Sequence, residues 1–147
     1  MTDELDRRVL EVLNQNARRS FREIAKEVGI SVTAVIHKIK KLEEAGAIKG
    51  YIPVLNPESF GYNLTAIIAL RISKGKLLET QQLIAQEPQV VAVYDITGEW
   101  DSLVIGHFRA RDDLNRFIKK ILSLRYVDRT VTHLVLNVVK DEKRLPL

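Results

Sequence analysis

The stretch SFREIAKEVGISVTAVIHKIKKLEEAGAIK, Ser20 to Lys49, decides the fold of the first part of this 147-residue chain. Ser20, followed three residues later by Glu23, is a capping box, which predicts that a helix begins here. The predicted helix, Phe21–Val28, has apolar residues at the i, i+3, i+4, i+7 spacing of a buried face: Phe21, Ile24, Ala25 and Val28. Gly29 follows directly, where a glycine in the left-handed conformation ends a helix.

A second helix is predicted from Val32 to Ala45, with Ser31 as its cap and Gly46 after its end. At about 100° per residue, its apolar side chains fall within an arc of roughly 120°, the width of a core-facing stripe. They are Val32, Val35, Ile36, Ile39 and Leu42. Ile48–Ile52 is predicted to form a short strand. An earlier stripe of Leu5, Val9, Val12 and Leu13 predicts a third helix, which completes a helix-turn-helix unit.

The opposite side of the second helix is suited to DNA. It collects small, polar and basic residues, with Lys40 at its margin: Thr33, Ala34, His37, Lys38 and Lys41. Lysines neutralise phosphates, whereas threonine, histidine and the alanine methyl suit base edges and the thymine methyl. Arg18 and Arg19 are candidate backbone clamps. The predicted DNA-binding set is therefore Arg18, Arg19, Ser31, Thr33, Ala34, His37, Lys38 and Lys41. The alternative is an ordinary solvated basic surface.

The bulk composition fits a protein that binds a polyanion. The net charge is +4, and Arg18–Lys49 holds 8 Lys+Arg against 4 Asp+Glu. With no cysteine there is no disulfide, thiolate metal site or cysteine nucleophile. The beginning MTDELDRR is not a signal peptide, and no apolar run has the length of a membrane span. We expect a cytoplasmic protein without a membrane partner or a metal.

The second half of the chain reads as β-α-β twice over. Strands are predicted at 64–72, 90–97, 102–109 and 130–139, and helices at 76–86 and 112–124. We expect an α+β fold with a helix-turn-helix domain at 1–50, a strand and linker at 51–63, and a ferredoxin-like βαββαβ domain at 64–147. With both helices on one face of the sheet, the apolar residues of the other face need cover, which predicts a partner subunit. A two-fold dimer would also place two recognition helices about 34 Å apart on a duplex.

The chain resembles the Lrp/AsnC (feast/famine) family of prokaryotic transcription regulators nearly end to end. In the first half the resemblance rests on Leu5-Asp6, Ile24-Ala25, Gly29-Ile30-Ser31, Lys40 to Glu44, Gly46, Ile48 and Gly50-Tyr51. In the second half it rests on Thr97 to Asp101, Phe117, Val127, Arg129-Thr130, Thr132 and Lys140. The resemblance implies a homodimer built through the C-terminal domain, often assembled into tetramers or octamers. It also implies nucleoid association and an amino-acid effector bound where dimers meet.

Carried onto this sequence, the family's effector pocket would use the predicted turn after the second strand and the last strand. The effector-binding set is Gly98, Glu99, Trp100, Asp101, Thr130, Thr132 and His133. A free amino acid needs a carboxylate for its ammonium, which Asp101 or Glu99 would supply, and donors for its carboxylate, which Gly98 and Thr132 would supply. The alternative is an ordinary hairpin turn with Trp100 covering the sheet edge. Lys38 departs from the family's commoner arginine and lacks the bidentate fork, which favours a phosphate contact there.

Two other functions stay open. Some decarboxylases of haem-precursor biosynthesis share this two-domain plan and use histidine and arginine around a tetrapyrrole. His107 and His133 lie on predicted strands where they would line such a pocket, but no metal-ligand spacing, Ser/His/Asp set or carboxylate pair is present. The third alternative is an amino-acid-sensing assembly without DNA binding, which the intact helical hairpin disfavours. We expect a non-enzymatic regulator with no cofactor besides the amino-acid effector.

Overall fold

The computed structural model describes residues 3–147, which form two compact units. The helical unit runs to Val54 and also includes Lys140–Leu147, whereas the sheet unit is Leu55–Val139. The expected second domain therefore loses its last residues to the helical unit. The contact that explains this is local to that unit: Asn14 Nδ2 donates to the backbone oxygen of Leu145 at 2.8 Å.

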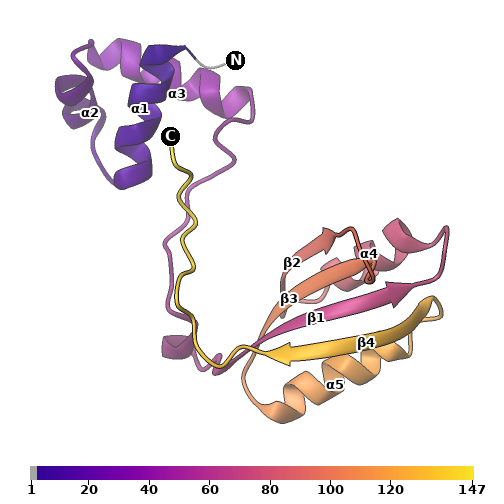
Figure 1. Cartoon of the computed structure of the whole chain (residues 1–147). Coiled ribbons are helices and arrows are strands. Elements are labelled where there is room, and N and C mark those ends of the chain that lie inside the picture. Colours follow the sequence, from indigo (N-terminus) through magenta and orange to yellow (C-terminus); the bar gives the residue numbers. More distant parts are fainter. Residues whose placement is uncertain (1–2) are drawn as a thin grey trace. The chain divides into compact units, whose positions relative to one another are not determined.

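The helical unit contains α1 (Glu4–Gln15), α2 (Phe21–Val28) and α3 (Val32–Glu44) (Figure 1). The predicted capping box of α2 is present, and Gly29 ends that helix at φ 78°. A second capping box, Asp3 with Asp6, opens α1. The buried core joins residues of all three helices: Val9, Val12, Leu13, Ile24, Ala25, Val28, Val35 and Ile39. The helix-turn-helix prediction is confirmed.

Two local predictions in this unit are wrong. Ile48–Ile52 forms no strand, and Ile52 is 86% exposed. A strand needs a hydrogen-bonded neighbour, and within residues 3–147 the only sheet is formed by other segments. The apolar stripes are also narrower than predicted, since Phe21, Val32 and Ile36 are 37–45% exposed. They lie on the first turns of their helices or at the margin of the stripe, where a core formed by three short helices does not cover them.

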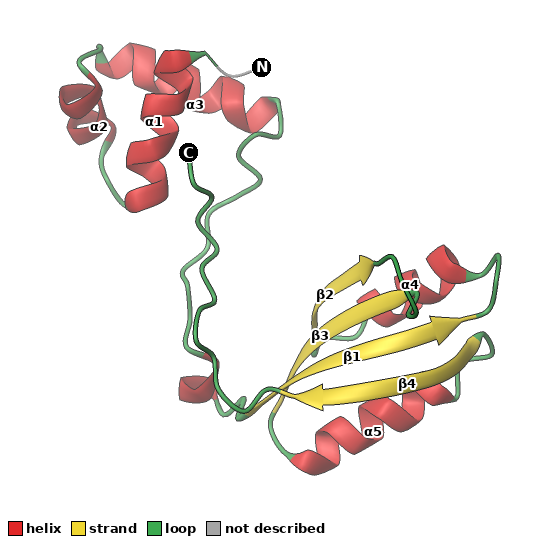
Figure 2. Cartoon of the chain, in the orientation of Figure 1, coloured by secondary structure: helices red, strands yellow, loops and turns green. Residues whose placement is uncertain are grey.

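The sheet unit begins with a short 3₁₀ helix, Pro57–Phe60, and continues as β1 (Leu64–Ile72), α4 (Leu77–Ala85), β2 (Val90–Asp95), β3 (Ser102–Phe108), α5 (Arg111–Leu122) and β4 (Val127–Leu134). The strand order is β2-β3-β1-β4, and all pairs are antiparallel. The predicted α+β fold with a βαββαβ unit is confirmed. Figure 2 shows the four strands as one sheet with the helices packed against it.

The last strand begins and ends earlier than the predicted 130–139. Val127 and Arg129 already pair with the end of β1, at Ile72 and Arg71. At the other end, Leu134 pairs with Ala66, and β1 itself begins at Leu64. Beyond β4, the Val135 N–H still donates to the oxygen of Thr65 at 2.9 Å. Only Leu64 of β1 then remains, so the residues after Val135 have no strand to pair with.

The two faces of the sheet differ in cover. Because cross-strand partners point to the same face, Ala66, Ile68 and Leu70 share one face with Val104 and Phe108. This face packs against both helices in a single core that includes Ile84 of α4 and Phe117 of α5. The other face carries apolar side chains that stay partly exposed in this chain: Ile67, Leu103, Ile105, Tyr94 and Val131. Nothing in residues 3–147 with helical structure is long and apolar enough to cross a membrane.

Candidate nucleic-acid interface and effector site

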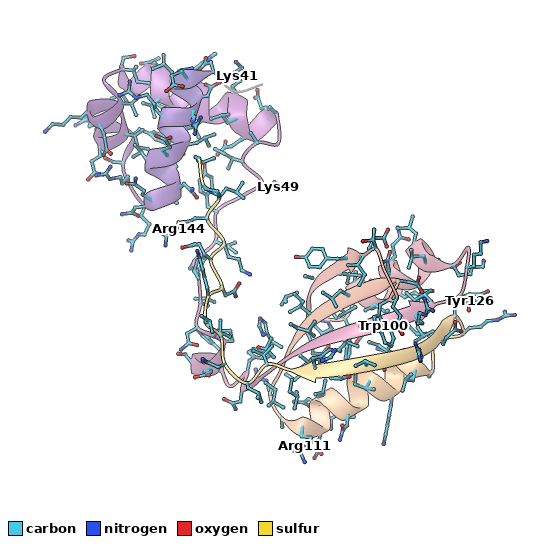
Figure 3. All side chains as sticks on the ribbon, in the orientation of Figure 1. Lys41, Lys49, Trp100, Arg111, Tyr126 and Arg144 are labelled. Atoms are coloured by element: carbon cyan, nitrogen blue, oxygen red, sulfur yellow. The ribbon has the colours of Figure 1, made fainter. Side chains whose placement is uncertain are left out.

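The outer face of α3 is exposed and firmly supported. Val35, Ile39 and Leu42 are buried on one side, while Ser31 Oγ accepts from the backbone N–H of Ala34 at 3.1 Å and caps the helix. On the opposite side, a set of exposed or half-exposed side chains shares one face: Thr33, Ala34, His37, Lys40 and Lys41. Lys41, marked in Figure 3, forms no ion pair with the described residues. Four residues of the predicted set, Thr33, Ala34, His37 and Lys41, thus lie on this face, with Lys40 at its margin and Ser31 as the helix cap.

Lys38 is not on this face, contrary to the prediction. Its Nζ donates to Asp6 Oδ1 at 2.8 Å and to Asp3 Oδ2 at 3.1 Å. The Lys38 side chain is 18% exposed and that of Asp6 is 2% exposed. The hydrogen bond from Lys38 lowers the pKa of the Asp6 carboxyl, and the same bond raises the pKa of Lys38. The ammonium therefore joins α1 to α3.

The two arginines before α2 differ in exposure and in ion pairing. Arg19 is half-buried and forms an ion pair with Glu27 of α2. Arg18 is exposed, and its backbone N–H donates to Asn16 Oδ1 at 3.0 Å, which fixes the turn below it. Among the described residues neither guanidinium hydrogen-bonds a side chain of α3, so the structure does not join them to that face.

Asp101 has a structural role that the sequence interpretation missed. Its Oδ2 accepts from the backbone N–H of Ile72 at 2.8 Å, and its own N–H donates to the oxygen of Leu70 at 2.9 Å. These bonds hold the Gly98–Asp101 turn to the end of β1, where the β1–β4 register shifts between Arg71 and Ile72. Of the two carboxylates considered for an effector ammonium, only Glu99 is exposed and free of backbone bonds in the described chain.

Arg129 belongs to the Gly98–Asp101 turn in space, although it was not among the predicted site residues. Its Nη2 donates to Glu99 Oε1 at 3.0 Å, and its guanidinium lies 4.9 Å from the centroid of the Trp100 ring. Figure 3 shows Trp100 near the beginning of β4. A βαββαβ sheet places its last strand beside its first, so the strand order would have predicted a contact between the start of β4 and this turn.

The remaining predicted effector residues lie on different faces of β4. Thr130 and Thr132 pair with Leu70 and Ile68, on the helix-covered face, whereas His133 pairs with Ile67 on the open face. His107 also lies on the open face, where its Nδ1 is 3.0 Å from Thr65 Oγ1. Residues 3–147 contain no group of three His, Cys, Asp or Glu side chains that would hold a metal ion.

Comparison with known proteins assigns both units. Residues 2–49 match the model of winged helix-turn-helix DNA-binding domains, and residues 65–145 match that of the Lrp/AsnC ligand binding domain. The chain belongs to the Lrp/AsnC family. An HTH-type transcriptional regulator of Pyrococcus abyssi is 46% identical over 145 residues, 99% of each chain. One from Methanocaldococcus jannaschii is 36% identical over 148 residues, all of each chain.

Solved structures of this family have the same fold. AsnC of E. coli is 27% identical, with a TM-score of 0.89 over 97% of each chain. A regulator of Neisseria meningitidis, crystallised as an L-Met complex, is 29% identical, with a TM-score of 0.90 over 99% of this chain and 97% of its own. This Lrp/AsnC protein is therefore a DNA-binding transcriptional regulator. Since its relatives are named as regulators, the decarboxylase alternative is set aside.

Proposed function

We propose that this regulator contacts double-stranded DNA through the outer face of α3, with Thr33, Ala34 and His37 at base edges and Lys41 and Arg18 at phosphates. The observation that carries the proposal is a capped helix pinned by its buried side, with the opposite side exposed and basic. A major groove accepts such a helix. Lys38 acts by positioning, because its bonds to α1 fix the helix, and Ser31 and Arg19 likewise support the unit.

A salt titration tests the phosphate contacts. The probe is a duplex selected from a random library by the unaltered protein. Each lost phosphate contact should reduce the slope of log affinity against log salt by about 0.9. Lys41→Ala should therefore show a lower slope than the unaltered protein. Lys119→Ala, an exposed lysine on α5 without an ion pair in the described chain, is the matched control. Equal slopes for all three proteins would contradict the assignment of Lys41.

We infer further that two copies of the chain pair through the open face of the sheet. Partly exposed Ile67, Leu103 and Ile105 lie on that face, and apolar patches of this kind are typical of interaction surfaces. A two-fold pair would present two α3 helices to one side of a duplex. Dimers would assemble further into tetramers or octamers, and light scattering should return a multiple of the 16.8 kDa chain mass.

An amino-acid effector is the third part of the proposal. Support comes from the match to a family ligand-binding domain and from the L-Met complex of the Neisseria regulator. In this chain, Glu99 would accept the effector's ammonium after releasing Arg129, since an exposed ion pair opens at little cost. Gly98 would flank its carboxylate beside Trp100. Because Thr130 and Thr132 lie on the other face of β4 from His133, these β4 residues would contribute from a neighbouring subunit.

A thermal-shift screen of the twenty amino acids identifies the effector, because a specific ligand stabilises the folded state by mass action. Glu99→Gln should remove the shift produced by the best ligand. Glu79→Gln, which alters another exposed ion pair, with Lys76 at the start of α4, should leave the shift unchanged. A shift that survives Glu99→Gln in full would place the effector elsewhere.

A further inference from the structure

The sheet unit contains a cavity of about 200 Å³ where β3 ends and α5 begins. Its lining includes Tyr62, Gln89, Arg109 and Asp113. The Gly98–Asp101 turn precedes the other end of the seven-residue strand β3. At about 3.3 Å per residue, the two places are roughly 20 Å apart along the strand. The cavity is therefore separate from the turn assigned to the effector.

An unsatisfied acceptor lies in the lining of this cavity. Gln89 Oε1 is buried and has no hydrogen-bond partner in the described chain. The backbone of Gln89 is held in place, because its carbonyl oxygen accepts from the His107 N–H at 2.9 Å. A Cβ added at Gly106 would lie 3.2 Å from that oxygen and 2.9 Å from the Phe108 ring. Since buried polar atoms are almost always paired, the unpaired side-chain oxygen, Gln89 Oε1, indicates a missing donor.

A cation lines the same cavity in a fixed orientation. The Arg109 guanidinium lies 4.6 Å from the centroid of the Tyr62 ring, and its Nη1 donates to the oxygen of Phe60 at 3.0 Å. An arginine has five N–H donors in one plane. With stacking and one backbone bond holding that plane, the remaining donors are available to an anion. No carboxylate in the described chain forms an ion pair with Arg109.

An anion lines the cavity as well. Asp113, in the first turn of α5, bonds Arg116 through Oδ1, and its side chain is 28% exposed. Its Oδ2 has no hydrogen-bond partner among the described residues. The small cavity thus combines an oriented guanidinium, a carboxylate oxygen and a buried amide oxygen. An inorganic anion would complement only the first of these, whereas a zwitterion complements all three.

We propose that this cavity binds a small zwitterionic α-amino acid, at a site distinct from the Gly98–Asp101 turn. The ligand carboxylate accepts from Arg109, and its ammonium donates to Gln89 Oε1 and Asp113. Sites for drug-sized ligands measure about 300–1,000 Å³, so a cavity of this volume selects side chains as small as those of glycine, alanine and serine. The proposal does not depend on the effector assigned to the turn, nor on DNA contacts.

Isothermal titration of the full chain with alanine tests the proposal, with propionate and ethylamine as probes that each lack one charge. Saturable alanine binding is expected, at an affinity at least about tenfold above that of either probe, since both charge-assisted contacts are needed. Asp113→Asn and Arg109→Gln should each weaken alanine binding by about tenfold or more. The matched controls are Asp112→Asn and Arg111→Gln, exposed neighbours outside the lining, which should change it less than about twofold.

A second variant separates binding from folding. Gln89→Met removes the unpaired oxygen, so it should weaken alanine binding without lowering the melting temperature of the ligand-free protein. No saturable binding of alanine, glycine or serine would overturn the proposal, as would propionate binding as tightly as alanine. Alanine binding that Glu99→Gln abolishes and Asp113→Asn leaves intact would also overturn it, because the ligand would then occupy the turn.

Discussion

Within each of the two units, polar side chains join the elements, and the kind of polar group differs between the units. In the helical unit, Lys38 binds Asp6 and Asp3 and so ties α1 to α3 with full charges. In the sheet unit, Gln81 of α4 donates to the buried hydroxyl of Ser102 at 3.0 Å, and that hydroxyl donates to the oxygen of Tyr94, also at 3.0 Å. Removing one member of a buried ion pair leaves the other charge buried without compensation. Removing a neutral hydrogen-bonding side chain costs a hydrogen bond. The helical unit is therefore expected to respond more strongly than the sheet unit to pH and to the loss of one partner.

The largest effect is expected when Lys38 is removed. Lys38→Met leaves the Asp6 carboxylate, 2% exposed, without its cation, and breaking such a buried pair costs about 3 kcal/mol. The single tryptophan, Trp100, lies in the sheet unit. Urea unfolding followed by far-UV circular dichroism should therefore shift to lower urea, while the Trp100 fluorescence transition should not move.

Lys40→Met is the matched control for that experiment. Its partner Glu44 is 3.8 Å away, and both side chains are about 70% exposed, at 71% and 68%. Such a surface pair contributes less than about 0.5 kcal/mol. If Lys38→Met proved as mild as Lys40→Met, the charged joint between α1 and α3 would not be a stabilising feature.

A smaller effect is expected at the neutral joint. Gln81→Leu removes the amide that bonds Ser102 and Asp95 Oδ1, the latter at 2.5 Å. The loss should destabilise the sheet unit by about 1–2 kcal/mol, because the Ser102 hydroxyl keeps its bond to Tyr94. The Trp100 transition reports it. Gln82→Leu, at the exposed neighbouring position, is the control, and an equal shift there would show that the joint is not responsible.

The pH dependence should also separate the units. The pKa values of Asp3 and Asp6 are lowered from 3.8, for Asp6 mainly by the hydrogen bond from Lys38. A lowered carboxylate pKa stabilises the folded state above the unfolded pKa, and this contribution is lost as pH falls through the folded value. The helical unit should thus weaken below about pH 4. Lys38→Met should show a flatter acid limb by circular dichroism, and an unchanged limb would contradict the linkage.

Features set by neighbouring residues could be predicted from the sequence, whereas contacts between distant segments could not. Caps and periodicity are local, so α2, Gly29, α3 and the βαββαβ pattern were predictable from neighbouring residues. The ion pairs of Lys38 were not predicted, because its partners Asp3 and Asp6 lie at the start of α1. The position of Lys38 around α3 does not show which side chains of another helix it contacts. The bond of Asp101 to Ile72 N was not predicted, because it depends on the register shift between β1 and β4. The start of β4 was set too late, which hid the contact of Arg129 with Glu99.

The most direct test of the account compares His37→Ala with Lys41→Ala on a panel of single-base variants of the selected duplex. Lys41→Ala should weaken binding to a similar degree on every duplex, because phosphate contacts carry no sequence information. His37→Ala should instead relax discrimination at one or two base pairs, where a good base contact is worth about 1–3 kcal/mol. Uniform losses across the panel for both variants would contradict base reading by the outer face of α3.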